Sequence, residues 1–429
     1  MNNNTSAIRT NDVNEKTISI SGVAVFIMLV LTALTGIVNQ TVLSLGVVLC
    51  CAILFLYDKL HLALPFMIFY NSFYGVLFGV SLLRFYTLFV LARIMMKVTE
   101  KTSFSIKHLI PLVVYVLFIV STMIPAVGVM SSMMIILDVI VCFMLVSQIV
   151  ELGEDTIKDI FKIYSFVCLL SFITGLITEN KLGDEYNYTR YMATFEDPNY
   201  MGMFFTVAVF ALVTLKLFDK RVRVLLVLAL YACILSTLSI TAIIVNAVLW
   251  VAYLTILKKI KIKAVIAIGV VFVVAFAIFR YGVDNPTTPV LGDLASRVND
   301  KLISLEAGDM SGVTTGRSNL AAEHLEYYIN LPFFNVLFGG ISSNARYINP
   351  DLGYAAHNEY VDLLLNVGFI GTLIMLIYFI GRSSPHIRDY RSTKGEKSLF
   401  FIMTKCIWAM YALALTMFLD FRFMIFFLI

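Results

Sequence analysis

Long apolar runs separated by short polar loops fill most of this 429-residue chain. A helix that crosses a membrane needs roughly 20 mostly apolar residues, and runs of that kind recur from residue 19 onward. The pattern predicts spans at about 19–38, 41–57, 62–81, 83–97, 109–128, 131–150, 161–178, 199–217, 222–238, 239–257, 264–280, 360–380 and 398–419. The last residues, FRFMIFFLI, are too few to cross a bilayer and predict either a half-helix or a truncated span.

The composition fits an all-α, polytopic integral membrane protein. Hydrophobic residues make up 60% of the chain and charged residues 14%, and the mean hydropathy is +0.89, whereas soluble domains carry about 25% charged residues. We therefore expect about 12–14 transmembrane helices and one large extracytoplasmic loop that contains short helices. The net charge of +4 and the lack of a basic tract argue against nucleic acid as a partner.

The cysteines argue against a cross-linked or metal-binding protein. Each of the six lies inside an apolar run, and none has the spacing that is typical of zinc ligands. We therefore expect no disulfide framework, no metal site and no cofactor.

Lysine and arginine predict the orientation, because positive residues near span ends collect on the cytoplasmic side of a membrane. One alternating set of loops contains Lys59, Lys97, Lys101, Lys107, Lys158, Lys162, Lys220, Arg221, Arg223, Lys258, Lys259, Lys261, Lys263, Arg382, Arg388, Arg391, Lys394 and Lys397. That set is predicted to be cytoplasmic, together with the N-terminal tail at residues 1–18, which has no signal-peptide pattern. Transmembrane helices at 19–280, an external loop at 281–358 and C-terminal transmembrane helices at 359–429 would follow the tail.

Two loops on the predicted outer face are longer than turns, at 179–198 and 281–358. Within the second, the apolar spacing predicts short helices at 291–306 and 317–330, separated by the flexible break GDMSGVTTG. No ATP or sugar nucleotide is available outside the cytoplasm. An activated substrate for this face is therefore expected to arrive attached to lipid.

The shorter loop ends in a strong helix start, EDPNY. Asp197 followed by Pro198 is typical of an N-cap and a first helical position, and this can be no more than the start of a span. The positive end of such a helix also suits a phosphate or diphosphate, and Arg190 lies nearby in the sequence. The sequence leaves both interpretations open.

The larger loop contains the other candidates. His357 and Asn358 stand where the loop gives way to an apolar helix, and Arg317 precedes a helical pattern. Each residue alone is more typical of an interfacial, capping or solvated position. Together they favour chemistry, because a neutral imidazole can accept a proton from a sugar hydroxyl while a guanidinium binds an oxyanion. Weaker candidates of the same kind are Arg280, Arg297 and Arg346.

The order of these motifs resembles the O-antigen polymerase and O-antigen ligase superfamily. The motifs are Arg190, Phe195, Asp-Pro-Asn at 197–199, Gly316-Arg317, Gly339-Gly340, His-Asn-x-Tyr-Val at 357–361 and Gly-Phe-Ile-Gly at 368–371. They cover about residues 160–380, and the architecture covers the whole chain. One departure lies in the stretch STLSITA, where members often carry Thr-x-Ser-Arg and this chain has Ile240 in place of the arginine.

The resemblance implies a metal-independent glycosyltransferase. It would polymerise undecaprenyl-diphosphate-linked oligosaccharide repeat units into an O-antigen, capsule or exopolysaccharide at the outer face of the bacterial cytoplasmic membrane. His357 would be a general base or positioning group for the acceptor hydroxyl, with Arg317 and Arg190 binding the donor diphosphate. Substrate binding at the helix starts would fall to Asp197, Asn199 and Asn358. The expected partners are the lipid-linked glycan donor and acceptor and membrane lipid, with a chain-length regulator and a flippase as further candidates.

Three alternatives stay open. A ligase of the same superfamily would transfer the lipid-linked glycan to another acceptor. A lipid-linked oligosaccharide flippase or transporter would need polar groups near the bilayer midplane and often an inverted repeat, but the predicted spans are poor in charge and no repeat is visible. A purely structural subunit would tolerate loss of the external Arg and His residues.

Overall fold

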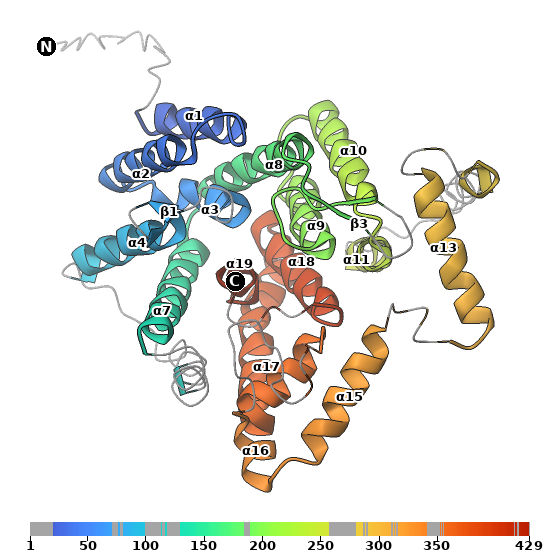
Figure 1. Cartoon of the computed structure of the whole chain (residues 1–429). Coiled ribbons are helices and arrows are strands. Elements are labelled where there is room, and N and C mark those ends of the chain that lie inside the picture. The colour runs from blue at the N-terminus through green and yellow to red at the C-terminus, as the bar shows by residue number, and fades with distance from the viewer. Residues whose placement is uncertain are drawn as a thin grey trace, which may run out of the picture.

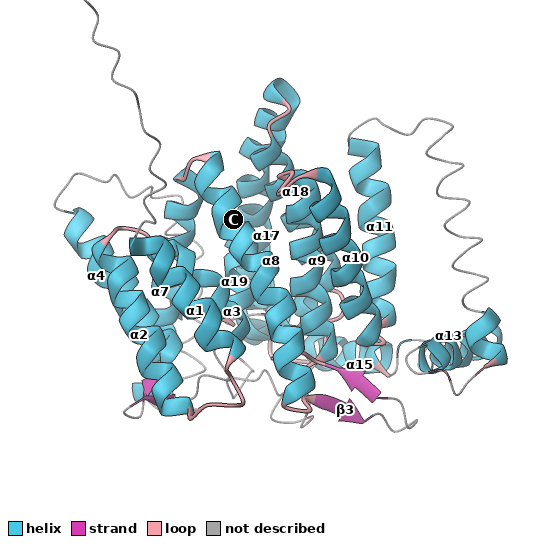
Figure 2. Ribbon diagram, turned by 90° about the horizontal axis from the view of Figure 1, so that it is seen from above, coloured by secondary structure: helices cyan, strands magenta, loops and turns pink. Residues whose placement is uncertain are grey.

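The protein is a bundle of helices (Figures 1 and 2). The computed structural model describes residues 20–70, 76–77, 80–98, 113, 116–117, 129–183, 189–256, 280–285, 288, 291–309, 312, 314, 316–340, 352, 354, 356–415, 417 and 420–428. These residues are mostly helical, so the all-α prediction is confirmed.

The bundle helices follow the apolar runs of the sequence. They are α1 (Ile20–Ala33), α2 (Gln40–Leu56), α4 (Leu82–Val98), α7 (Val129–Glu151), α8 (Glu154–Ile177), α9 (Pro198–Thr214), α10 (Lys220–Ser236), α11 (Ile240–Ile256), α17 (Glu359–Thr393) and α18 (Glu396–Tyr411). Most of their axes run in about the same direction in Figure 2. Short connections make sequence neighbours pack side by side, as α1 does with α2, α9 with α10, and α17 with α18.

Shorter elements complete the fold. The helices are η1 (Leu60–Ala63), α3 (Leu64–Tyr70), α13 (Leu291–Glu306), α15 (Arg317–Ile329), α16 (Phe333–Phe338) and α19 (Phe421–Leu428). Two antiparallel hairpins pair β1 (Val76–Leu77) with β2 (Val80–Ser81), and β3 (Lys181–Gly183) with β4 (Thr189–Tyr191). In Figure 2, β3, α13 and α15 lie at the same end of the bundle.

Helix α9 forms the centre of the core. Almost all of its residues are buried, as expected of a helix that is apolar on every side, and it packs against α8, α10, α11 and α18. Aromatic rings fix its beginning. The Phe195 and Phe204 rings stack with centroids 4.9 Å apart, and the Phe69 ring meets Phe195 edge-on at 5.4 Å. The segment that enters α9 is therefore held rigidly.

Several predicted elements are confirmed. The helices predicted at 222–238 and 239–257 are α10 and α11, and the two short helices predicted in the large loop are α13 and α15. The final residues form the short helix α19, which fits both alternatives that the sequence leaves for them. The spans predicted at 109–128 and 264–280 fall almost entirely outside the described residues.

Three predicted spans were wrong in extent. The span at 62–81 is not one helix, since α3 ends at Tyr70 and the hairpin β1–β2 follows, in a stretch whose Asn, Ser and Gly residues favour turns. Helix α17 runs to Thr393 instead of ending at 380, because hydropathy marks an apolar run and not the end of helix formation. Helix α18 ends at Tyr411 instead of 419, where the chain turns and offers its carbonyl groups to other segments.

Two of the described helices, α8 and α17, are long and apolar enough to cross a membrane by length and composition. Shorter apolar helices include α1, α2, α9 and α11. The polytopic arrangement thus stays a prediction from the sequence.

Helix α17 contains a sharp kink at Gly368 that lets α16 pack against it. Gly368 has φ +69° and ψ −177°, a conformation that is essentially restricted to glycine. A Cβ atom at Gly368 would lie 2.4 Å from the backbone nitrogen of Gly339, and one at Gly339 would lie 2.4 Å from the carbonyl oxygen of Asn366. The Gly-Gly motif at 339–340 and the Gly-Phe-Ile-Gly motif at 368–371 therefore contact each other through their backbones, at Gly339 and Gly368.

Replacing Gly368 with Ala should lower the thermal unfolding midpoint of the purified protein in detergent. The backbone strain alone costs about 1–3 kcal/mol, and the clash with α16 adds to it. Gly381→Ala is the matched control, because Gly381 lies on the same helix with no atom within 4 Å of its added Cβ. Equal midpoints for the two variants, measured by circular dichroism, would contradict this account of the kink.

Candidate functional site

Asp197 begins helix α9, as the sequence predicts. Its Oδ1 accepts hydrogen bonds from the backbone N–H of Asn199 at 2.6 Å and from the Asn199 side-chain amide at 2.7 Å. Pro198 occupies the first helical position, where its missing N–H costs no hydrogen bond. The anion at this helix start is therefore the protein's own carboxylate, and the N–H of Asn199 is not available to a phosphate.

Asn199 joins the start of α9 to the turn between α10 and α11. Its side chain is almost fully buried, and its Oδ1 accepts a hydrogen bond from the Ser239 hydroxyl at 2.6 Å. The Ser239 hydroxyl oxygen in turn accepts from the backbone N–H of Ala242 at 3.1 Å, in the first turn of α11. Asn199 is thus a connector between helices, a role that the sequence pattern does not reveal.

Arg190 reaches the same turn from strand β4. It is buried, and its Nε donates to the carbonyl oxygen of Thr237 at 3.0 Å. Thr237 and Ser239 belong to the stretch STLSITA, in which Ile240 stands where the superfamily often carries arginine. A guanidinium is therefore present at this turn, although it comes from another segment.

Arg317 is the first residue of α15 and follows Gly316, which has φ +78°. Its Nη1 donates to the carbonyl oxygen of Ala414 at 3.1 Å. Burial lowers the pKa of Arg317 from its usual value, Asp197 opposes this shift, and the positive charge of Arg297 adds to it. A guanidinium remains charged at neutral pH despite such a shift. Arg317 is therefore a partly buried cation within electrostatic range of Asp197 and Arg297.

His357 precedes α17 with a backbone φ of +50°, which is uncommon for a residue other than glycine. Partial desolvation lowers its pKa, Arg317 lowers it further, and Asp197 opposes both effects. The side chain is still exposed by surface area, so water moderates the shift. The imidazole is neutral at neutral pH and can accept a proton.

Asn358 is the N-cap of α17. Its Oδ1 accepts hydrogen bonds from the backbone N–H groups of Tyr360 at 3.1 Å and Val361 at 3.3 Å. The backbone N–H of Glu359 donates to the carbonyl of Ala412 at 2.8 Å. The turn at 412–414, directly after α18, therefore holds both the start of α17 and the Arg317 guanidinium.

The structure thus brings Asp197, Arg317 and His357 together, and it places Arg190 and Asn199 at the adjacent turn. Arg280 lies apart from this group, with an exposed side chain 3.9 Å from Asp284. Arg346 lies outside the described residues. No group of three His, Cys, Asp or Glu residues that could hold a metal ion occurs in the described part of the chain.

Sequence reasoning missed three residues near this site: Glu196, Asp420 and Arg422. The Arg422 guanidinium forms ion pairs with both carboxylates, at 3.2 Å to Glu196 and 2.7 Å to Asp420. One signal was available, because a charged residue within the apolar run FRFMIFFLI is costly and marks a functional or paired position. Its partner at Glu196 could not be read from the sequence.

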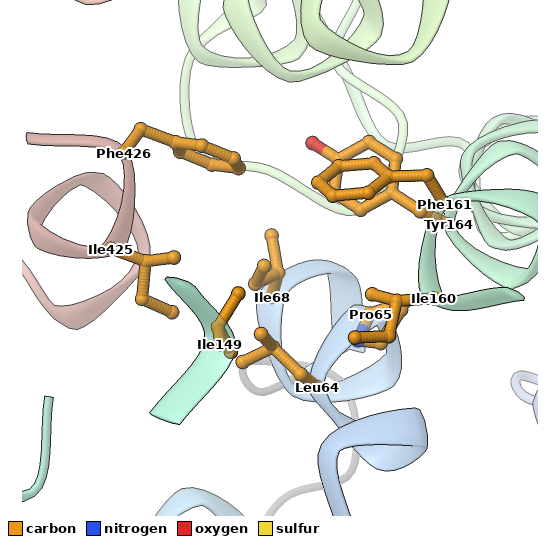
Figure 3. Close-up of a pocket in the computed structure, with 9 residues that line it drawn as sticks. All are labelled: Leu64, Pro65, Ile68, Ile149, Ile160, Phe161, Tyr164, Ile425 and Phe426. Atoms are coloured by element: carbon orange, nitrogen blue, oxygen red, sulfur yellow. The ribbon is translucent and has the colours of Figure 1, made fainter. Parts of the chain in front are cut away.

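A small apolar cavity lies inside the bundle (Figure 3). Its lining comes from α3, α7, α8 and α19: Leu64, Pro65, Ile68, Ile149, Ile160, Phe161, Tyr164, Ile425 and Phe426. The volume of about 10 Å³ has room for roughly one water-sized sphere. This cavity is therefore a packing defect in the core and too small for a substrate.

The chain matches no family model, no curated protein and no solved structure. The function of the site must therefore be argued from its own geometry and from the motifs.

Replacing Ser239 with Ala should destabilise the protein by about 1–3 kcal/mol, because the buried Asn199 Oδ1 loses its donor. Ser236→Ala is the matched control, since the Ser236 hydroxyl only donates to the Cys233 carbonyl of its own helix. Chemical unfolding of the two purified variants in detergent measures the difference. An S239A midpoint equal to that of S236A would show that the link between α9 and α11 contributes little.

Proposed function

We propose that this protein is a membrane glycosyltransferase that polymerises undecaprenyl-diphosphate-linked oligosaccharide repeat units into a surface polysaccharide. The observation that carries the proposal is the convergence of Arg317, His357 and Asp197 from three separate segments. Arg317 donates to the carbonyl of Ala414 at 3.1 Å. Asn358, the residue after His357, donates to the carbonyl of Leu413 in the same turn at 3.4 Å. Asp197 acts electrostatically on both Arg317 and His357. A guanidinium and a neutral imidazole suit transfer from a lipid diphosphate to a sugar hydroxyl.

The outer surface of the bundle supports a membrane location. Large apolar side chains face outward on several helices, among them Phe26, which is 65% exposed, Leu225 at 66% and Val251 at 55%. Apolar side chains exposed over neighbouring helices are unusual for a protein in water and are favourable against hydrocarbon. These side chains support a polytopic arrangement, in which β3–β4, α13 and α15 would lie at one surface of the membrane (Figure 2).

Charges at the opposite end of the bundle support the predicted orientation. Helix α9 begins at the site and ends near Lys216, whose ammonium lies 2.6 Å from Glu396. The Lys158 ammonium lies 3.0 Å from the same carboxylate. Lysine-rich connections of this kind favour the cytoplasmic side. The site at the other end would then face outward, where lipid-linked glycans are the available activated sugars.

The proposed reaction is a displacement at the anomeric carbon of the donor sugar. The acceptor hydroxyl oxygen bonds to that carbon while its proton passes to the neutral imidazole of His357. The bond between the anomeric carbon and the phosphate oxygen breaks, and undecaprenyl diphosphate leaves with the electron pair. Arg317 stabilises the negative charge that develops on the leaving diphosphate, with Arg190 as the neighbouring guanidinium.

Arg190 can replace the arginine that the superfamily often carries at the position of Ile240. The superfamily often has an arginine in the turn between the two helices, and here β4 brings the Arg190 guanidinium to the carbonyl of Thr237 in that turn. The chain therefore retains a cation at the place where the resemblance implies a phosphate contact. This supports assignment of Arg190 to the donor side.

Replacing Arg317 or His357 with Ala should abolish long-chain polysaccharide. Loss of the general base is expected to lower the rate by about 10²–10⁴-fold, and loss of Arg317 removes the leaving-group cation. Gel electrophoresis of the polysaccharide from a deletion host that expresses each variant measures chain length, after membrane insertion is verified.

Arg280→Ala is the control, because Arg280 is exposed and lies outside the group. Wild-type chain lengths in R317A or H357A would contradict the assigned roles. Transfer of glycan to a different acceptor without intermediate chain lengths would favour the ligase alternative instead.

Replacing Asp197 with Asn should move the acidic limb of the kcat/KM profile to lower pH. In the wild-type protein this limb should lie below about pH 6.5, the usual His pKa, because desolvation and Arg317 lower the pKa of His357. Activity is lost as pH falls through that pKa, since only neutral imidazole accepts the proton. Asp197 raises the pKa, so removing its charge lowers it further, while Asn caps a helix equally well.

Asp219→Asn is the control for this pH experiment. Asp219 caps α10 by accepting hydrogen bonds from the N–H groups of Arg221 and Val222, and it belongs to a loop on the predicted cytoplasmic side. Initial rates of glycan transfer over a pH series provide the measurement. An acidic limb that moves upward in D197N, or moves equally in D219N, would refute the assignment.

A further inference from the structure

Helix α19 lies in the middle of the bundle, where it contacts α7, α17 and α18 (Figure 1). Its buried side chains are Phe423, Met424, Ile425, Phe426 and Phe427. At its start, Oδ1 of Asp420 accepts a hydrogen bond from the backbone N–H of Arg422 at 2.9 Å. At its end, the Lys405 ammonium donates to the carbonyl of Phe427, as suits the negative end of a helix dipole. Both ends of α19 are thereby fixed.

Arg422 links α19 to the segment that leads into α9. Its Nε and Nη2 donate to the two carboxylate oxygens of Asp420, at 3.1 and 2.7 Å. Its Nη1 and Nη2 also donate to Oε2 of Glu196, at 3.2 and 3.3 Å. The Cζ atom lies 5.7 Å from the ring centre of Phe195 and 6.0 Å from that of Tyr200. These hydrogen bonds and ring contacts fix the orientation of the Arg422 guanidinium.

Glu196 differs from the rest of this cluster in its exposure. Its side chain is 54% exposed, compared with 11% for Arg422 and 27% for Asp420. Glu196 directly precedes Asp197, the N-cap residue that accepts a hydrogen bond from the backbone N–H of Asn199 at the start of α9. The Glu196 carboxylate therefore lies at the edge of the proposed site. The ion pair with the less exposed Arg422 fixes its position.

We propose that Glu196 binds hydroxyl groups of the acceptor sugar and that Arg422 is the residue that positions it. The inference rests on the proposed function, because it assigns the acceptor side of the same site. An ionised carboxylate has two oxygens that accept hydrogen bonds from neighbouring hydroxyls. Such charge-assisted bonds are roughly twice as strong as neutral ones, and they specify the orientation of the sugar.

Charge balance favours this role over that of a simple counter-ion. Asp420 already neutralises Arg422 through the shorter contacts, so Arg422 does not need a second carboxylate. Glu196 and Asp420 carry one more charge than Arg422 neutralises, so this side of the site is negative. That charge repels a phosphate but not a neutral hydroxyl donor. The donor diphosphate is therefore assigned to the side of Arg317, and the acceptor glycan to the side of Glu196.

The test uses the full-length protein in detergent and two separate probes. One probe is the repeat-unit oligosaccharide, released by mild acid from the lipid-linked glycan that accumulates in a deletion host. The other is undecaprenyl diphosphate, which carries no sugar. We expect Glu196→Gln to weaken oligosaccharide binding by about 10–100-fold and to leave undecaprenyl diphosphate binding unchanged. Arg317→Ala should give the opposite pattern.

Glu179→Gln is the matched control. Its side chain is 78% exposed and lies at the start of the loop that ends at Glu196. It should bind both probes as the wild type does. Where Glu196→Gln does not insert into the membrane, Glu196→Asp gives the same comparison, because it shortens the side chain by one methylene group and keeps the charge.

The role of Arg422 is tested with Arg422→Lys alone and combined with Glu196→Gln. Lysine keeps the charge but loses the bidentate geometry, so oligosaccharide binding should fall by about tenfold. In the E196Q background the same change should have no further effect, because Arg422 acts through Glu196. A merely structural Arg422 would instead lower the unfolding midpoint and weaken binding additively with E196Q.

Two results would overturn the inference: wild-type oligosaccharide binding in E196Q, or equal loss of both probes in that variant. Additive effects of R422K and E196Q would remove the positioning role. The proposed function fails separately, when undecaprenyl diphosphate binds equally well to the wild type and R317A. In that case a selective loss of oligosaccharide binding in E196Q still identifies Glu196 as a glycan-binding residue.

Discussion

The structure depends on one constraint: an apolar bundle has no water inside it to satisfy the polar groups at helix ends. The chain meets this constraint with its own side chains and turns. Asp197 caps α9 and Asn358 caps α17. The carbonyl groups that follow α18 accept hydrogen bonds from the N–H of Glu359 and from Arg317. The bonds that complete the helix ends are therefore the bonds that assemble the site.

Buried hydrogen bonds and close backbone contacts fix the helices near the site relative to one another. Asn199 ties α9 to the turn before α11 through the Ser239 hydroxyl. Gly339 and Gly368 bring the backbones of α16 and α17 into direct contact. The roles proposed for His357 and Arg317 require such fixed geometry, because catalytic groups must be held near their productive positions.

The sequence predicts what is local and misses what is distant. A helix start such as Asp197-Pro198 is encoded within a few residues, and so are the amphipathic patterns of α13 and α15, so these predictions were confirmed. Hydropathy measures apolar content only, and for that reason it merged α3 with the hairpin β1–β2 and ended α17 too early. The pairing of Glu196 with Arg422 joins residues far apart in the chain. No local pattern encodes such a contact.

Asp197 explains how a partly buried cation can lie beside the neutral base of the proposed site. A histidine next to an arginine tends to stay neutral, because a second positive charge is unfavourable there. An arginine in a partly buried position needs a nearby carboxylate to offset the cost of desolvation. Asp197 supplies that carboxylate, and its Oδ1 also accepts the hydrogen bonds from Asn199 that cap α9. The pKa of His357 stays lowered because desolvation and Arg317 outweigh Asp197, so the proposed base is neutral beside a cation that Asp197 helps to stabilise.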